Sequence, residues 1–127
     1  RPVQGMRKAR CFSAAASVNR CIYLFGGLNE ASRPTDSAER LDTEAEAWMT
    51  LPPLSCARFG AVAAAVDRRR IIVCGGRKED HTSSSDAVDV FDCARGNWAS
   101  ETCVGPMSRP RAFSLTAATA THLYVVG

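Results

Sequence analysis

A segment of about 50 residues repeats along this chain, and this repeat constrains the fold more than any other feature of the sequence. The run Cys-Ile-Tyr-Leu-Phe-Gly-Gly at residues 21–27 returns as Arg-Ile-Ile-Val-Cys-Gly-Gly at 70–76 and as His-Leu-Tyr-Val-Val-Gly at 122–127. The first glycine of each run lies 49 and then 52 residues after the one before it. Such a period is typical of arrays of one small structural unit.

Other residues recur with the same period. Asp42 and Trp48 return as Asp92 and Trp98, in both cases 50 residues later. The two ends of the chain also align without a gap at an offset of 101 residues. Seven identities result: Met6, Arg10, Phe12, Ser13, Ala16, Tyr23 and Gly26 match Met107, Arg111, Phe113, Ser114, Ala117, Tyr124 and Gly127. The chain is therefore a repeat protein.

Each repeat is predicted to form four short strands. A small apolar run, a short polar turn and the apolar run that ends in glycine are typical of a β-hairpin. A longer polar loop and two further strands follow. Outside the glycine-ended runs, the predicted strands are 12–18, 38–41 and 48–51 in the first repeat and 61–66, 87–91 and 98–100 in the second. The fold class is all-β, built of four-stranded antiparallel units.

These elements resemble the kelch repeat, which forms one four-stranded blade of a β-propeller. The resemblance covers essentially the whole chain, although kelch blades usually have Tyr where Leu41 and Phe91 stand. The matching motif residues are the doublets Gly26-Gly27 and Gly75-Gly76, Asp42 and Asp92, Trp48 and Trp98, and the exit Pro52-Pro53-Leu54-x-x-x-Arg58. The resemblance implies that these residues build the blade: glycine for close backbone approach, Asp for the turn amides and Trp for packing between sheets.

The resemblance also divides the chain into blades. The exit of a preceding blade is expected at 1–10, kelch blades at 11–57 and 58–107, and the first two strands of a further blade at 108–127. Because propellers close with about four to eight blades, this is an incomplete ring. We expect the open blade faces to need the remaining blades of a longer chain or self-association. The isolated chain is then unfolded or self-associated, and a monomeric elution profile with a cooperative melt would contradict this.

Binding residues are expected in the loops, because propellers carry function in loops that the blades position. The resemblance indicates the loops 28–37 and 77–85, and the segments that lead into the first strand of each blade. The candidate partner-binding residues are Asn29, Glu30, Arg33, Phe59, Arg77, Lys78, Asp80, His81 and Arg109. Phe59 is expected to be an apolar anchor. Arg10, Arg58 and Arg111 stand at a repeated exit position, so we expect them to be structural.

Charge and composition exclude several other classes. Sixteen Lys and Arg against thirteen Asp and Glu leave a net charge of +3, which does not indicate a nucleic-acid surface. No apolar run approaches the roughly 18 residues of a membrane span. The basic run Arg68-Arg69-Arg70 occupies a predicted hairpin turn, where solvated side chains are the expected state. His81 beside two acidic residues is a single imidazole, so we expect no metal and no cofactor.

The cysteines indicate a reducing compartment. Six are scattered without zinc-type spacing, at positions 11, 21, 56, 74, 93 and 103. Several adjoin apolar strands, where a free thiol packs as a small apolar group. No Asn-x-Ser/Thr acceptor is present. We therefore expect reduced cysteines and a cytoplasmic location.

The leading functional hypothesis is a non-enzymatic module that binds a protein or peptide. Kelch propellers often recognise substrates for ubiquitin-ligase adaptors, and the resemblance implies this role. One alternative is part of a kelch-type enzyme, either a copper oxidase, which needs convergent Tyr and His residues, or a sugar epimerase. A second alternative is an actin-binding structural propeller. No catalytic residue is expected.

Overall fold

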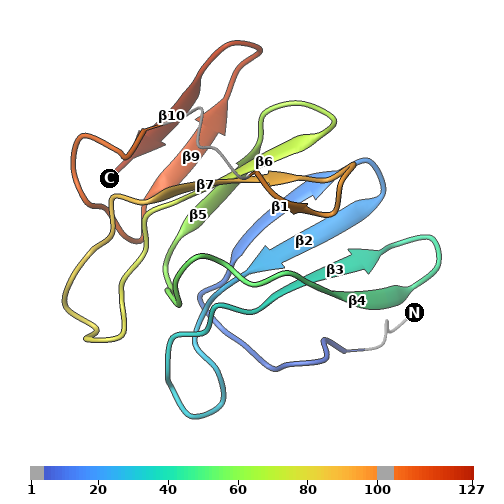
Figure 1. The fold of residues 1–127 in the computed structure, drawn as a ribbon, viewed down its shortest axis with the longest axis horizontal. Coiled ribbons are helices and arrows are strands. Elements are labelled where there is room, and N and C mark those ends of the chain that lie inside the picture. The colour runs from blue at the N-terminus through green and yellow to red at the C-terminus, as the bar shows by residue number, and fades with distance from the viewer. Residues whose placement is uncertain (1–4, 100–104) are drawn as a thin grey trace.

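The computed structural model describes residues 5–99 and 105–127, which form two four-stranded antiparallel sheets followed by a hairpin (Figure 1). The first sheet comprises β1 (Ala14–Val18), β2 (Cys21–Phe25), β3 (Ala38–Asp42) and β4 (Ala47–Leu51). The second comprises β5 (Val62–Ala65), β6 (Arg70–Cys74), β7 (Val88–Asp92) and β8 (Asn97–Trp98). The hairpin pairs β9 (Leu115–Ala118) with β10 (Leu123–Val126). The predicted all-β fold of antiparallel blades is confirmed.

The sheets succeed one another like blades around an axis. In both sheets the strands pair in chain order, from the first to the fourth. The first strands lie side by side, β1 next to β5 and β5 next to β9 (Figure 1). The long loops leave one end of the sheets and the short β1–β2, β5–β6 and β9–β10 turns leave the other. We call these the loop end and the turn end.

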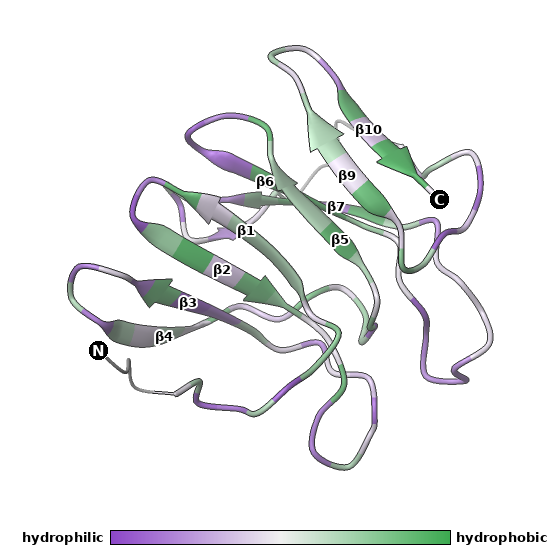
Figure 2. Ribbon diagram, turned by 180° about the vertical axis from the view of Figure 1, so that it is seen from behind, coloured by the Kyte–Doolittle hydropathy of each residue, from purple (hydrophilic) through white to green (hydrophobic). Residues whose placement is uncertain are grey.

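The core lies between the two complete sheets. Phe25 of β2 is 5.7 Å from Phe91 of β7 and 5.3 Å from Trp98 of β8, measured between ring centroids. The indole N–H of Trp98 also donates to the carbonyl of Pro52, across 3.0 Å. Hydrophobic residues follow the strands while the turns are hydrophilic (Figure 2). The expected packing role of the second-repeat Trp is therefore confirmed.

The glycine doublets end the second strands where two blades touch. Gly26 has a φ of +63°, and a Cβ there would lie 2.5 Å from the carbonyl oxygen of Arg58. The next amide, that of Gly27, donates to the same carbonyl at 2.9 Å. The second doublet repeats this geometry, because a Cβ on Gly75 would lie 2.3 Å from the carbonyl oxygen of Arg111. Each doublet therefore couples one blade to the next through backbone contact.

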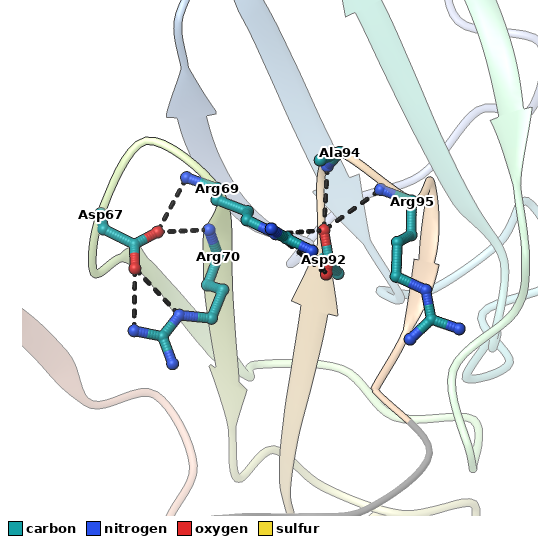
Figure 3. Close-up of polar contacts among 6 residues, drawn as sticks. All are labelled: Asp67, Arg69, Arg70, Asp92, Ala94 and Arg95. Carbon is teal, nitrogen blue, oxygen red and sulfur yellow. Dashed lines mark hydrogen bonds and ion pairs between the residues drawn. The ribbon is translucent and has the colours of Figure 1, made fainter.

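The repeated Asp residues organise the turn between the third and fourth strands. Asp42 accepts the amides of Glu44 and Ala45 at 3.0 and 3.1 Å, and Asp92 accepts those of Ala94 and Arg95 at the same distances (Figure 3). The predicted role of Asp is confirmed. The turn also needs one left-handed residue, which is Gly96 in the second blade and Glu46 in the first, with φ values of 65° and 54°.

Asp92 makes the turn sensitive to acid. The Arg69 side chain holds the pKa of Asp92 below its ordinary value, and the turn amides act in the same direction. A lowered folded-state pKa means that the carboxylate stabilises the fold above the ordinary pKa, and that this contribution is lost as pH falls through the folded-state value.

Asp92→Asn keeps an oxygen for the turn amides but removes the charge that pairs with Arg69. We expect the variant to be less stable than the parent chain at neutral pH, and we expect this deficit to shrink as the pH falls below the ordinary Asp value. Urea midpoints at neutral pH and at a series of acidic pH values measure the difference. A deficit of the same size in acid would show that the carboxylate charge is not responsible.

The repeated exit arginines are structural, as the sequence indicates. Arg10 donates to the carbonyls of Gly26 and Ser37 at 3.0 and 2.8 Å, and pairs with Glu39 at 2.8 Å. The Arg10 and Glu39 side chains are both 2% exposed. Arg58 is fully buried and pairs with Asp89, which stands 50 residues after Glu39. Arg111 donates to the carbonyl of Gly127 at 2.6 Å. Each arginine thus fastens the start of a blade to its inner strands.

The hairpin leaves one apolar face open. Leu115, Tyr124 and Val126 are 77, 51 and 64% exposed. At the offset of 101 residues, Tyr124 and Val126 correspond to Tyr23 and Phe25, which are buried against the second sheet. The exposed side chains therefore occupy positions that a neighbouring sheet covers elsewhere in the chain.

Two further findings concern the expected environment. Residues 5–99 and 105–127 contain no helix that is long and apolar enough to cross a bilayer. Five cysteines are free thiols, namely Cys11, Cys21, Cys56, Cys74 and Cys93. Cys103, like residues 1–4 of the expected preceding blade, lies outside the described residues.

Candidate protein-interaction surface

The two loops that follow the glycine doublets have similar backbones, although the second loop is one residue longer. The amide of Asn29 donates to the carbonyl of Arg33 at 2.9 Å, and that of Lys78 donates to Ser83 at 3.0 Å. His81 has a left-handed φ of 59°. Ser32, 49 residues earlier, has a φ of 57°. The shared backbone presents different side chains in each blade, as expected for loops that carry specificity.

Two of the candidate residues close their own loops. The side-chain oxygen of Asn29 accepts the amides of Ala31 and Arg33 at 2.9 and 3.1 Å. Asp80 likewise accepts the amides of Thr82 and Ser83 at 2.9 and 2.8 Å. A further hydrogen bond from the Ser83 hydroxyl is the largest cause that lowers the pKa of Asp80 to about 2. Asn29 and Asp80 therefore shape the loops.

Phe59 is not the exposed anchor that the sequence predicts. The residue is only 6% exposed. Its backbone forms a short antiparallel bridge with Arg77, with N–H to oxygen distances of 3.1 and 2.7 Å. Its ring packs 5.1 Å from the ring of His81. Phe59 thus supports the loop that carries His81 from beneath.

Two other phenylalanines supply the exposed apolar surface. Phe12 and Phe113 are 57 and 52% exposed and meet edge to face, with ring centroids 5.8 Å apart. Gly60 stands at the same position in the second blade: its amide donates to Phe12 at 2.9 Å, and its carbonyl accepts from Phe113 at 2.8 Å. All three residues are left-handed, with φ values of 55°, 66° and 54°. A bulky residue in this conformation is a strained outlier, and such residues concentrate at functional sites.

The alignment of the repeats contains a signal from which these two phenylalanines could have been predicted as candidate residues. Phe12 and Phe113 are one of the identities at the offset of 101 residues. The second blade has glycine at this position, and glycine adopts the left-handed conformation most easily. A phenylalanine there is therefore not required by the backbone of the turn.

Arg77 joins the loop to the exposed rings. Its guanidinium lies 5.6 Å from the ring centroid of Phe113 and donates to the carbonyl of His81 at 3.0 Å. The structure therefore brings three sequence-predicted residues together with two that the prediction missed. We name this set the aromatic face: Phe12, Phe59, Arg77, His81 and Phe113.

The remaining candidates lie apart from these contacts. They are exposed, and within residues 5–99 and 105–127 their side chains make no hydrogen bond or ion pair; they are Glu30, Arg33, Lys78 and Arg109. Glu30 lines a shallow hollow of about 370 Å³ together with Arg7 and Lys8. These side chains are available to a partner.

Comparison with known proteins agrees with the fold. The sequence matches the family model of the Kelch motif over residues 9–55. It is 32% identical over 90 residues to an F-box/kelch-repeat protein of Arabidopsis thaliana, an alignment that covers 71% of this chain and 24% of that protein. The chain belongs to the kelch-repeat family.

Other kelch proteins show similar identity. Kelch-like protein 15 of Danio rerio is 29% identical over 99 residues, covering 73% of this chain and 16% of the relative. A kelch repeat-containing protein of Dictyostelium discoideum is 29% identical over 82 residues, covering 64% of this chain and 12% of the relative. The chain thus spans less than a quarter of the length of these three relatives.

The tyrosines and histidines of this kelch chain do not converge. His81 contacts Phe59 at the loop end, whereas His122 lies in the β9–β10 turn with its ring 6.0 Å from that of Tyr124. Tyr23 is 3% exposed, and burial is the largest cause that raises the pKa of Tyr23 to about 12. Within the described residues, no group of three or more His, Cys, Asp or Glu side chains is placed to hold a metal ion.

Proposed function

We propose that this chain is a protein-interaction module that captures a protein or peptide partner at the aromatic face. The observation that carries the proposal is the exposed pair Phe12 and Phe113, held in a strained backbone conformation at the loop end. Exposed apolar patches bordered by polar residues are typical of interaction sites. The proposal includes no catalytic step.

The chemistry of the face suits a partner with an apolar side chain next to a carboxylate. The rings offer rigid contact area with few rotatable bonds, and aromatic and Arg residues supply much of the binding energy at protein interfaces. Arg77 is already oriented by Phe113 and by the carbonyl of His81. Little further ordering is needed for its guanidinium to pair with a carboxylate.

The same proposal extends to substrate recognition for a ubiquitin ligase. It is supported by the resemblance to kelch adaptors and by relatives whose names combine F-box with kelch repeat or read kelch-like. In that role the aromatic face would hold the substrate while other parts of the assembly act on it.

Two variants test the face. Phe12→Gly copies the residue that the second blade has at this position, so we expect its stability to stay within about 1 kcal/mol of the parent chain. Arg77→Glu with Lys78→Glu reverses the charge of the loop. Both should reduce partner capture by about tenfold or more, the size of a hot-spot loss. Quantitative pull-down of the captured proteins measures this.

The matched control is Arg95→Gln. Arg95 is exposed and lies in the β7–β8 turn (Figure 3), at the turn end of the sheets, whereas the aromatic face lies at the loop end. A genuine partner is retained by this control and lost by both variants. Equal capture by all the proteins would refute the proposed binding face.

A further inference from the structure

A second, chemically different hollow lies at the turn end. It has a volume of about 530 Å³ and opens between the two sheets, where the β1–β2, β5–β6 and β7–β8 turns meet. Its charged lining consists of Arg20, Arg40 and Arg68 with one acid, Asp42. A cavity of this size suits a small-molecule ligand. Nothing in the aromatic face uses it, because the aromatic face lies at the loop end.

The arginine run of the β5–β6 turn divides into paired and unpaired residues. Arg69 pairs with Asp92 at 3.0 Å and Arg70 with Asp67 at 2.8 Å (Figure 3). Arg68 has no acid within 4.0 Å among the described residues, and it is the member of the run that lines the hollow. The paired neighbours are structural, which leaves Arg68 available to an anion.

The charge of the hollow is positive. Arg20 is paired with Asp42 at 3.4 Å and with Glu44, so these three groups together carry one negative charge, which the two positive charges of Arg40 and Arg68 outweigh. Arg40 forms no ion pair in the described part of the chain, and its Nε is buried without a hydrogen-bond partner. Its terminal nitrogen lies 3.5 Å from the sulfur of Met49, and its side chain also hydrogen-bonds to Tyr23, so both of these contacts are to uncharged groups. Two guanidinium groups, those of Arg40 and Arg68, therefore lack an anion.

We propose that this hollow binds a small organic phosphate. Arg is permanently charged and presents a planar set of N–H donors that matches phosphate oxygens, and two such groups complement a dianion. Asn19 adds a polar side chain to the same wall, while Val18 and Cys21 offer apolar surface for the carbon part of the ligand. This site is independent of the partner-binding role at the loop end.

Two cysteines in the lining of the hollow allow ligand binding to be measured. Cys21 and Cys93 both line it and both are partly exposed. A ligand seated between them and the arginines shields the thiols from alkylation. Cys11, exposed at the loop end, is an internal control, and buried Cys74 reports whether the chain stays folded.

The experiment measures alkylation of each thiol by iodoacetamide, with and without pyrophosphate, at constant ionic strength and mildly alkaline pH. Alkylation of Cys21 and Cys93 should slow by roughly threefold when pyrophosphate is present at about twice its Kd. The rate at Cys11 should not change. Arg68→Gln and Arg40→Gln should each remove the protection while Cys74 remains slow to react. Arg68 is exposed in a turn, so its variant tests the site even if Arg40→Gln disturbs folding.

Arg95→Gln is the control variant, since this exposed arginine of the turn end does not line the hollow. It should keep full protection. Citrate at equal ionic strength separates phosphate recognition from attraction of any polyanion, and it should protect less than pyrophosphate. Protection that is absent, that extends to Cys11, that survives Arg68→Gln or that citrate reproduces in full would overturn the proposal.

Discussion

Replacing Arg58 by Met should lower the free energy of unfolding by about 3 kcal/mol, because it breaks a buried ion pair and leaves the acid without its partner. The Arg58 side chain is 0% exposed, and Asp89 is 18% exposed. Met retains much of the apolar part of the Arg side chain, so the loss of stability measures the contribution of the guanidinium group. The Ser55 hydroxyl still donates to Asp89, at 3.1 Å, which keeps the expected cost at the lower end of the range for buried pairs.

A double-mutant cycle with Asp89→Asn isolates the pair. The coupling energy between the two sites should account for most of the effect of Arg58→Met. Arg69→Met is the matched control, because Arg69 also pairs with an acid of β7 but is 60% exposed and screened by solvent. Urea unfolding at one protein concentration measures all four variants. If Arg58→Met lowers the free energy of unfolding no more than Arg69→Met does, the buried ion pair does not stabilise the blade as the structure indicates.

The repeat period made the blade residues predictable. A residue that recurs at the same position in each blade has the same backbone environment. Gly26 and Gly75 therefore have the same role, as do Asp42 and Asp92, and the sequence repeat predicts it. The exit arginines follow the same logic, although only the structure shows that the acids opposite Arg10 and Arg58 are Glu39 and Asp89. The change from Glu to Asp hides this pair from a search for identities.

The aromatic face was only partly predictable, for a reason of register. Phe59 aligns with Cys11 and Ala112, one position before the left-handed residue, and its side chain turns into the blade. Phe12 and Phe113 stand on the left-handed residue itself and turn outward. A shift of one position therefore decides whether the phenylalanine side chain is buried or exposed, and this cannot be predicted from amino-acid composition. Arg77 was predicted as a loop cation, but its contact with Phe113 joins two blades and needs the fold.

Gly26→Ala should cost about 3–4 kcal/mol, the sum of left-handed strain and of a clash that the neighbouring blade has to absorb. The added Cβ would lie 2.5 Å from the carbonyl oxygen of Arg58, which is backbone and has little freedom to move. The same shift weakens the hydrogen bond from Gly27 to that carbonyl. We therefore expect the substitution to weaken the contact between the two sheets as well as to lower the free energy of unfolding.

Gly96→Ala supplies the matched control. Gly96 has nearly the same φ, +65° against +63°, but nothing lies within 4 Å of its added Cβ. That variant should lose only the conformational part, about 1 kcal/mol. Tryptophan fluorescence adds an independent signal, since the indole of Trp98 contacts Phe25 of the first sheet and Pro52, which directly follows that sheet. Equal losses in the two variants would mean that backbone conformation alone requires glycine in the doublet, whereas a larger loss with altered tryptophan fluorescence for Gly26→Ala would show that the doublet fastens one blade to the next.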